Sequence, residues 1–237
     1  MFAVPLLVSI RMGRHAPLAT LSAILALAYG VASPLLHEPG EANYALAVLK
    51  TSSIGLLAVV AFLHRSRLLG IALTFGALGD FLLALDTRFS FMLGASSFLI
   101  GHLFYIALFL RAGIGAAALR QPARLGAMAA TVALSVVMSL LLIPGDATLG
   151  QPLMIYSAVL TLMTLASFTL PASRWLVMTG AVLFLISDGF VAASAFQHEA
   201  FASDAPWFSF AGWMIYWAAQ ACLCFGALGL HRAPTHT

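Results

Sequence analysis

Long apolar stretches separated by short polar segments follow one another along the whole chain. Each stretch is close to the roughly 20 residues that an α-helix needs to cross a membrane. The connecting segments, such as 64–67 and 144–146, are charged or rich in turn formers. We therefore predict an all-α fold with a single eight-helix transmembrane domain over residues 1–237. The eight expected helices are Ala16–Leu36, Asn43–Leu63, Leu68–Leu85, Phe89–Leu110, Leu125–Ile143, Pro152–Leu170, Trp175–Phe196 and Phe208–Leu230.

The composition places the chain in a membrane. Hydrophobic residues make up 62% and charged residues 8%, whereas soluble domains contain about 45 to 50% and about 25%. We expect a multi-pass protein of the bacterial inner membrane. A net charge of +3 in a soluble chain would suggest a nucleic-acid partner, but here the basic residues fall into short loops, so no nucleic acid is expected.

The arginines indicate the orientation of the helices. With eight spans, nearly all of them lie on one side of the membrane, and Arg88 lies on the other. Because positive charges favour the cytoplasmic side, both termini are expected to be cytoplasmic. The arginines of the cytoplasmic side are Arg11, Arg14, Arg65, Arg67, Arg111, Arg120, Arg124, Arg174 and Arg232.

The first apolar run has two interpretations, a retained helix or a cleaved signal peptide. Its length of about 20 residues exceeds the roughly 7 to 15 of a signal peptide, so we expect a retained helix. Residues 1–10 are apolar but too short to span, which indicates an interfacial segment. Near the end of the third run, Asp86, Thr87 and Arg88 are expected to mark the outer helix end.

No cofactor or metal is expected. Cys222 and Cys224 are two positions apart on the last predicted helix and point to different sides, so we expect free thiols. No CxxC or HExxH pattern occurs, and no glycine-rich phosphate loop is present.

Two aspartates, Asp80 and Asp188, interrupt apolar runs that are both predicted to run from inside to outside. Each lies about 18 to 20 Å above the inner end of its helix at 1.5 Å per residue. A carboxylate at the centre of a span costs about 2.5 to 3.5 kcal/mol. Either a functional site or a structural cluster of polar side chains must compensate this cost. The sequences before the two aspartates also match, because Gly76 precedes Asp80 and Gly180 precedes Asp188. This local sequence similarity is consistent with two four-helix halves related by a parallel repeat.

Other polar residues are predicted to lie near the same depth and to line a polar cavity that opens outward. They are Lys50, Tyr156, Tyr216 and Gln220, with His102 and Tyr105 deeper. Lys50 has three interpretations: snorkelling to the outer headgroups, a salt bridge to an aspartate, or binding of a lipid phosphate. His102 is either an interhelical hydrogen-bond clamp or a catalytic group.

At these residues the chain resembles the YhhN-like lysoplasmalogenase family of eight-helix membrane proteins. The resemblance is carried by VLKTSS at Lys50, GALGDFLLAL at Asp80, the segment 94–105, Tyr156-Ser157, GAVLFLISDGFVA at Asp188, and Tyr216 with Gln220. Family members often carry proline after the lysine of the second helix, whereas this chain has Thr51.

The resemblance implies hydrolysis of the vinyl ether bond of lysoplasmalogens to a fatty aldehyde and a glycerophospho-alcohol, with a lysophospholipid as substrate. Such a reaction needs an acid to protonate carbon and an anion to stabilise the oxocarbenium ion. Asp80 and Asp188 are the expected catalytic pair, because two carboxyls in an apolar layer repel when both are charged, so one keeps its proton. Which of them keeps it is left open by the sequence. The lipid chain is expected among phenylalanines such as Phe81, Phe98 and Phe184.

Three other functions are compatible with these residues. A proton-coupled transporter also uses buried acids and a lysine, and a non-catalytic lipid-binding protein could use the acids only to hold its helices together. Serine nucleophile chemistry at Ser157 or Ser187 is disfavoured, because no GxSxG motif occurs and membrane serines commonly bond their own backbone.

Overall fold

The computed structural model describes residues 15–36, 42–85, 89–145, 148–197 and 205–230. The interfacial segment expected at residues 1–10 and the helix end expected at Asp86, Thr87 and Arg88 lie outside these ranges. Within them, regular structure is entirely helical. The all-α prediction is therefore confirmed.

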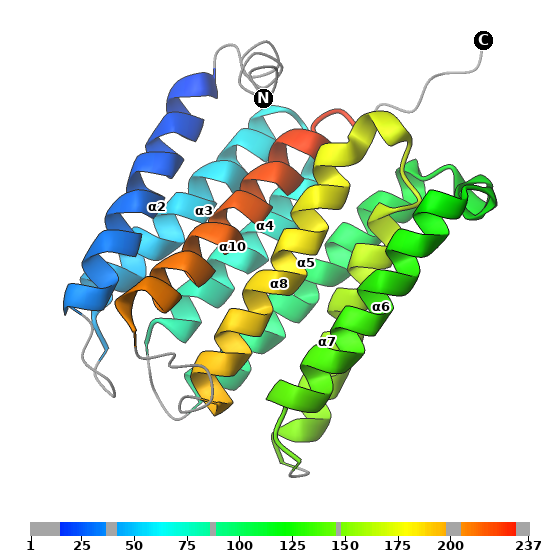
Figure 1. The fold of residues 1–237 in the computed structure, drawn as a ribbon. Helices are drawn as coiled ribbons and strands as arrows, with labels where there is room; N and C mark the ends of the chain where they lie inside the picture. Colours follow the sequence, from blue (N-terminus) through cyan, green and yellow to red (C-terminus); the bar gives the residue numbers. More distant parts are fainter. Residues whose placement is uncertain (1–14, 37–41, 86–88, 146–147, 198–204, 231–237) are drawn as a thin grey trace.

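The described residues form eight α-helices of 17 to 23 residues, close to the eight predicted runs. Proline occupies the start of α6 and of α10, where its missing N–H has no helical partner to lose. The helices, labelled in Figure 1, are α2 (Ala16–Leu36), α3 (Tyr44–Leu63), α4 (Arg67–Leu83), α5 (Ser90–Ala112), α6 (Pro122–Leu142), α7 (Gly150–Ser167), α8 (Trp175–Phe196) and α10 (Pro206–Ala227), with short 3-10 turns η2 (Gly115–Arg120) and η3 (Ala172–Arg174).

Six of these helices are long and apolar enough to cross a membrane: α2, α3, α5, α6, α8 with its preceding turn, and α10. The chain is thus a membrane protein by the length and composition of its helices. The two shortest helices are α4, with 17 residues, and α7, with 18. Crossing by all eight helices stays a prediction.

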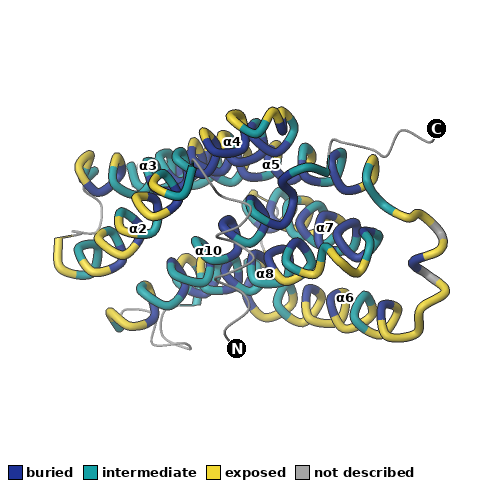
Figure 2. Tube along the Cα trace, turned by 90° about the horizontal axis from the view of Figure 1, so that it is seen from above, coloured by how far each residue is buried: buried dark blue, intermediate teal, exposed yellow. Residues whose placement is uncertain are grey.

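Seven of the described helices contact one another in a ring, and α6 lies outside it (Figure 2). Helices α3, α4 and α5 line one side, α8 and α10 line the other, and α2 and α7 join the two sides at the ends. Helix α6 packs against α7 and α8 and exposes most of its outer face. The two most extensive helix contacts, α4 with α5 and α8 with α10, are equivalent pairs in the predicted repeat.

Several predicted helix bounds differ from the structure by one to three residues, among them the ends of α4, α7 and α10. Helix α4 ends at Leu83, not at Leu85, so Asp80 lies in its last turn. Helix α10 ends at Ala227, not at Leu230, because Leu228 leaves the helical conformation and Gly229 adopts a φ of +80°. The early end of α4 leaves room beside Asp80 at that end of the bundle.

Two arginines, one buried and one half-buried, cap helix ends at the opposite end of the bundle. Arg124, at the start of α6, donates to the backbone oxygens of Phe168 and Leu170 at 2.7 and 2.6 Å. Arg174 donates to the oxygens of Gly226 and Leu228, both at 3.1 Å. These guanidinium groups satisfy C-terminal carbonyls of α7 and α10 that have no partner within their own helix.

Candidate functional site

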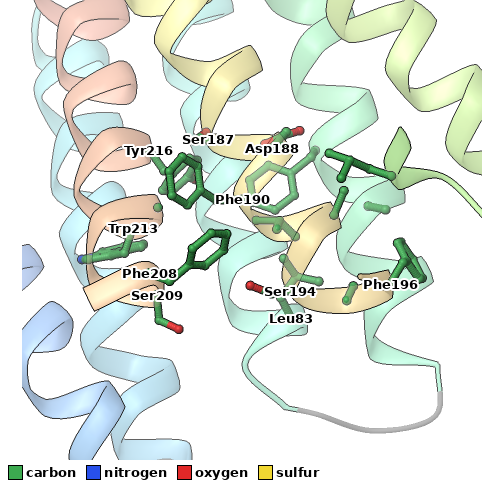
Figure 3. A pocket seen from close by; sticks show the side chains of 18 of the residues that line it. Leu83, Ser187, Asp188, Phe190, Ser194, Phe196, Phe208, Ser209, Trp213 and Tyr216 are labelled. Atoms are coloured by element: carbon green, nitrogen blue, oxygen red, sulfur yellow. The ribbon is translucent and has the colours of Figure 1, made fainter. Parts of the chain in front are cut away.

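A cavity of about 900 Å³ lies at the end of the bundle where α2, α4, α6 and α8 end and the other helices begin. All eight helices contribute to its lining. This is the end that the sequence predicts to face outward. Figure 3 shows Asp188 and Ser187 on α8 and Trp213 and Tyr216 on α10 beside this space. Lys50, Asp80 and Tyr156 also line it.

The two aspartates occupy equivalent places along their helices. Asp80 follows Arg67, the first residue of α4, by thirteen positions, and Asp188 follows Trp175, the first residue of α8, by thirteen. Their burial differs, since Asp80 is 2% exposed and Asp188 is half-buried. Both border the same cavity, as the sequence predicted.

Asp80 is held by a cation and a hydroxyl. Its Oδ1 lies 3.6 Å from Nζ of Lys50, and its Oδ2 accepts a hydrogen bond of 2.8 Å from the Tyr216 hydroxyl. Nε2 of Gln220 donates to the Tyr216 oxygen at 3.1 Å, so the tyrosine proton is directed to Asp80. Both carboxyl oxygens of Asp80 therefore face donors.

Asp188 has a different set of partners. Its Oδ2 accepts from the hydroxyl of Tyr156, and Nε2 of His102 lies 3.2 Å from the same tyrosine oxygen. No lysine, arginine or histidine in the described ranges forms an ion pair with Asp188. Nδ1 of His102 is buried and has no hydrogen-bond partner there. The Nε2–H tautomer, which leaves a lone pair and not an N–H unpaired, lets His102 donate to Tyr156.

The hydrogen bonds that start at Asp80 continue below the cavity. Gln220 accepts at Oε1 from the hydroxyl of Tyr105 at 2.8 Å. Tyr105, Gln220 and His102 are each 1% exposed and stand behind the cavity wall. The first sequence interpretation of His102, an interhelical hydrogen-bond clamp between α5 and α7, fits this geometry.

Aromatic rings surround the ammonium of Lys50. Its Nζ lies 5.6 Å from the ring centre of Tyr29 and 5.5 Å from that of Trp213. The two rings meet edge to face at 4.6 Å, and the Trp213 indole N–H donates to the oxygen of Ala26 at 2.7 Å. This aromatic clamp holds the cation beside Asp80 through ring faces that attract positive charge.

A group of hydroxyls forms the opposite wall, between α6 and α7. Ser139 and Ser157 lie 2.8 Å apart, and Ser135 bonds to Thr161 and, at 3.4 Å, to Ser157. The three serines line the cavity. Because these hydroxyls bond one another and the backbone, they join α6 to α7.

The glycines of the predicted repeat both make room for α10. A Cβ on Gly76 would lie 2.8 Å from Nε2 of Gln220, and one on Gly180 would lie 2.9 Å from the backbone oxygen of Ala219. The sequence similarity around the two aspartates is thus explained by packing, because each glycine allows its helix to approach α10 closely.

The structure brings all eight predicted site residues into two connected groups. One contains Lys50, Asp80, Tyr216, Gln220 and Tyr105, and the other contains Asp188, Tyr156 and His102.

The sequence analysis missed Tyr29, Trp213, Ser135 and Ser139. Trp213 was detectable, because it precedes Tyr216 by three residues and so shares its helix face. Tyr29 lies on a separate helix, and nothing in its local sequence marks it.

The expected chain site among phenylalanines was wrong in part. Phe98 lines the cavity, but Phe184 is 1% exposed and packs in the core. Phe184 meets the rings of Phe98, His102 and Tyr216 edge to face. Phe184 therefore packs behind Phe98 and Tyr216, which line the cavity.

Comparison with known proteins defines the family. A model of the YhhN family matches residues 45–227, which is most of the 237-residue chain. The chain belongs to the YhhN family. No curated protein and no solved structure matches it. The YhhN match includes every predicted site residue and ends where α10 ends, but it excludes α2 and with it Tyr29.

Thr51 does not break the helix of this YhhN chain. Helix α3 is continuous from Tyr44 to Leu63, so Lys50 reaches Asp80 from a regular helix. The cysteines are free, as predicted, and Sγ of Cys224 lies 3.5 Å from the backbone oxygen of Leu57. In the described ranges, no three His, Cys, Asp or Glu side chains gather closely enough to hold a metal ion.

Proposed function

We propose that this protein hydrolyses the vinyl ether bond of lysoplasmalogens, such as lysoplasmenylethanolamine or lysoplasmenylcholine. One observation carries the proposal: two carboxyl groups border one cavity in unequal surroundings. Asp80 has a cation beside it, and the partner of Asp188 among the described residues is a tyrosine hydroxyl. Unequal protonation is what acid-catalysed vinyl ether hydrolysis requires.

Asp80 is the anion of the pair. Lys50 faces one of its oxygens and Tyr216 donates to the other, so both oxygens accept from donors, which favours the ionised form. The role of the ionised carboxylate is to stabilise positive charge on the substrate and to orient the attacking water.

Asp188 is the general acid. Its Oδ2 accepts from Tyr156, which leaves Oδ1 to carry the proton at the cavity. Without a cation against it among the described residues, the neutral form of this carboxyl is the less costly one in an apolar layer.

The reaction follows from these roles. Asp188 gives its proton to the vinyl carbon beta to the ether oxygen, and the adjacent carbon becomes part of an oxocarbenium ion beside the Asp80 carboxylate. Water adds to that carbon and returns a proton to a carboxylate. The resulting hemiacetal collapses to a fatty aldehyde and a glycerophospho-alcohol. The protein needs no cofactor for these steps.

The orientation in the membrane is part of the proposal. The described arginines at helix junctions, Arg65, Arg67, Arg111, Arg120, Arg124 and Arg174, gather at the end opposite the cavity. This distribution supports cytoplasmic termini and a cavity that faces outward in a bacterial inner membrane.

The test uses purified protein in detergent micelles with a lysoplasmalogen, and mass spectrometry of the products. Wild-type protein should release aldehyde, and Asp80→Asn and Asp188→Asn should each reduce the rate by at least about a hundredfold. In D₂O with immediate borohydride reduction, one solvent deuterium should appear at carbon 2 of the alcohol derived from the aldehyde.

Three outcomes would contradict the proposal. Release of aldehyde that survives both substitutions would exclude the aspartate mechanism. Substrate movement into sealed vesicles without any product would favour the proton-coupled transporter, and lipid binding with no turnover or transport would favour the non-catalytic interpretation.

A further inference from the structure

A second, smaller hollow lies in the seam between α5 and α7. Its volume is about 170 Å³. Ile155 on its border is 61% exposed, and Ser96 is exposed as well, so the hollow opens on the outer surface of a membrane helix pair. We call it the α5–α7 groove, and it is lined by Met92, Ala95, Ser96, Leu99, Pro152, Leu153, Ile155 and Tyr156.

The groove is apolar along its length. Its α5 residues recur at intervals of three and four and so share one helix face. The Ser96 hydroxyl donates to the backbone oxygen of Met92 at 2.7 Å, which removes it as a donor to an occupant. Such a surface binds hydrocarbon in preference to a headgroup, because a polar group placed there would lose its water without gaining a partner.

The groove adjoins the main cavity. Ala95, Leu153 and Tyr156 line both spaces. The hydroxyl of Tyr156 donates to Asp188. An elongated molecule that lies across both spaces would contact Tyr156, the donor to Asp188.

The sizes of the two spaces suit different parts of a lipid. The main cavity, about 900 Å³, is in the range of sites that enclose a whole small molecule, and the groove, about 170 Å³, is below it. The main cavity also holds the polar groups Lys50, Ser135 and Ser139. The larger, more polar cavity therefore suits the headgroup and glycerol, and the smaller, open groove suits part of a single chain.

We propose that the α5–α7 groove binds the single aliphatic chain of a lysolipid and admits it sideways from the membrane. The inference rests on the proposed function and adds to it the place of the chain. A chain in the groove puts the bond next to the glycerol at Tyr156 and Asp188. The groove has room for one chain, which excludes lipids with two chains from the reacting position.

The first test is photo-crosslinking to the unmodified protein in detergent micelles. The probe is a single-chain alkyl ether lysophosphatidylethanolamine with a diazirine in the chain, which binds but cannot react as a vinyl ether. Crosslinked peptides should come from Met92, Leu99 and Ile155, and an excess of unlabelled lysolipid should suppress them. Crosslinks confined to other helices would overturn the inference.

The second test changes the groove. Ser96→Trp fills it, and Leu103→Trp is the matched control, because Leu103 lies seven residues later on the same face of α5, is also exposed, and does not line the groove. A long chain no longer seats fully in the filled groove, so kcat/KM should fall more for long chains than for short ones. Ser96→Trp should therefore shift the preferred substrate to shorter chains and reduce the crosslinks, and Leu103→Trp should do neither.

The two proposals fail in different ways. Crosslinks in the groove without any turnover of lysoplasmalogen would refute the proposed reaction and support the chain site. Turnover with an unchanged chain-length preference in Ser96→Trp would refute the chain site and leave the reaction supported.

Discussion

Nζ of Lys50 lies 3.6 Å from Oδ1 of Asp80, and the two side chains are 15% and 2% exposed. They belong to neighbouring helices, α3 and α4. The pair places a cation against one of the two cavity aspartates, and among the described residues Asp188 has no equivalent ion pair. This asymmetry is the physical basis for giving the aspartates different roles.

Lys50→Met should destabilise the protein by about 3 to 5 kcal/mol, because it leaves Asp80 buried without its cation. It should also reduce aldehyde release by at least about a hundredfold. Thermal unfolding in detergent and turnover of a lysoplasmalogen measure the two effects. The double variant Lys50→Met/Asp80→Asn should regain most of the stability and none of the activity. A single variant as stable as wild type would show that the pair is not coupled.

Removing either cavity tyrosine hydroxyl should slow turnover by about tenfold to a hundredfold, the value of a hydrogen bond to a charged or proton-transferring group. Tyr156→Phe removes the donor to Asp188, and Tyr216→Phe removes the donor to Asp80. Steady-state kinetics of each variant provide the measurement. Tyr44→Phe, at an exposed position on α3, should leave the rate unchanged, and an equal loss there would contradict a specific effect.

Trp213→Leu should lower kcat by about twofold to thirtyfold, because it removes one of the two rings beside the Lys50 ammonium. Trp213→Phe should retain more activity, since it keeps a ring although it loses the hydrogen bond to Ala26. The exposed Trp207 on the same helix provides the control Trp207→Leu. Equal rates for Trp213→Leu and Trp207→Leu would rule out a role of the clamp.

Arg124→Ala should reduce the free energy of unfolding by at least about 2 kcal/mol, because two carbonyls at the end of α7 lose a charged donor. Chemical denaturation in detergent measures this. Arg120→Ala, at an exposed position, should change it by less than about 0.5 kcal/mol. Folded Arg124→Ala protein should keep its turnover, because the capping site lies at the far end of the bundle; a selective loss of kcat would argue against a purely structural role.

The helices and the matching positions of the two aspartates along them were predictable from the sequence. Apolar runs of sufficient length allow few structures other than helices, because backbone groups in lipid must be paired within the segment. Counting 1.5 Å per residue then placed Asp80 and Asp188 at one level. The end of α4 was not predictable, since Leu82 to Leu85 remain apolar and the run carries no stop signal.

The sequence by itself determined that the chain forms a membrane-embedded helical bundle and that eight polar side chains lie within apolar runs. Only the tertiary structure decided which of them meet. It paired Lys50 with Asp80, joined Tyr156 to Asp188, and brought Tyr29 from outside the family match to the Lys50 ammonium. The reason is that hydrophobic periodicity specifies depth and helix face, whereas the choice of neighbour depends on how glycines, rings and helix ends pack between different helices.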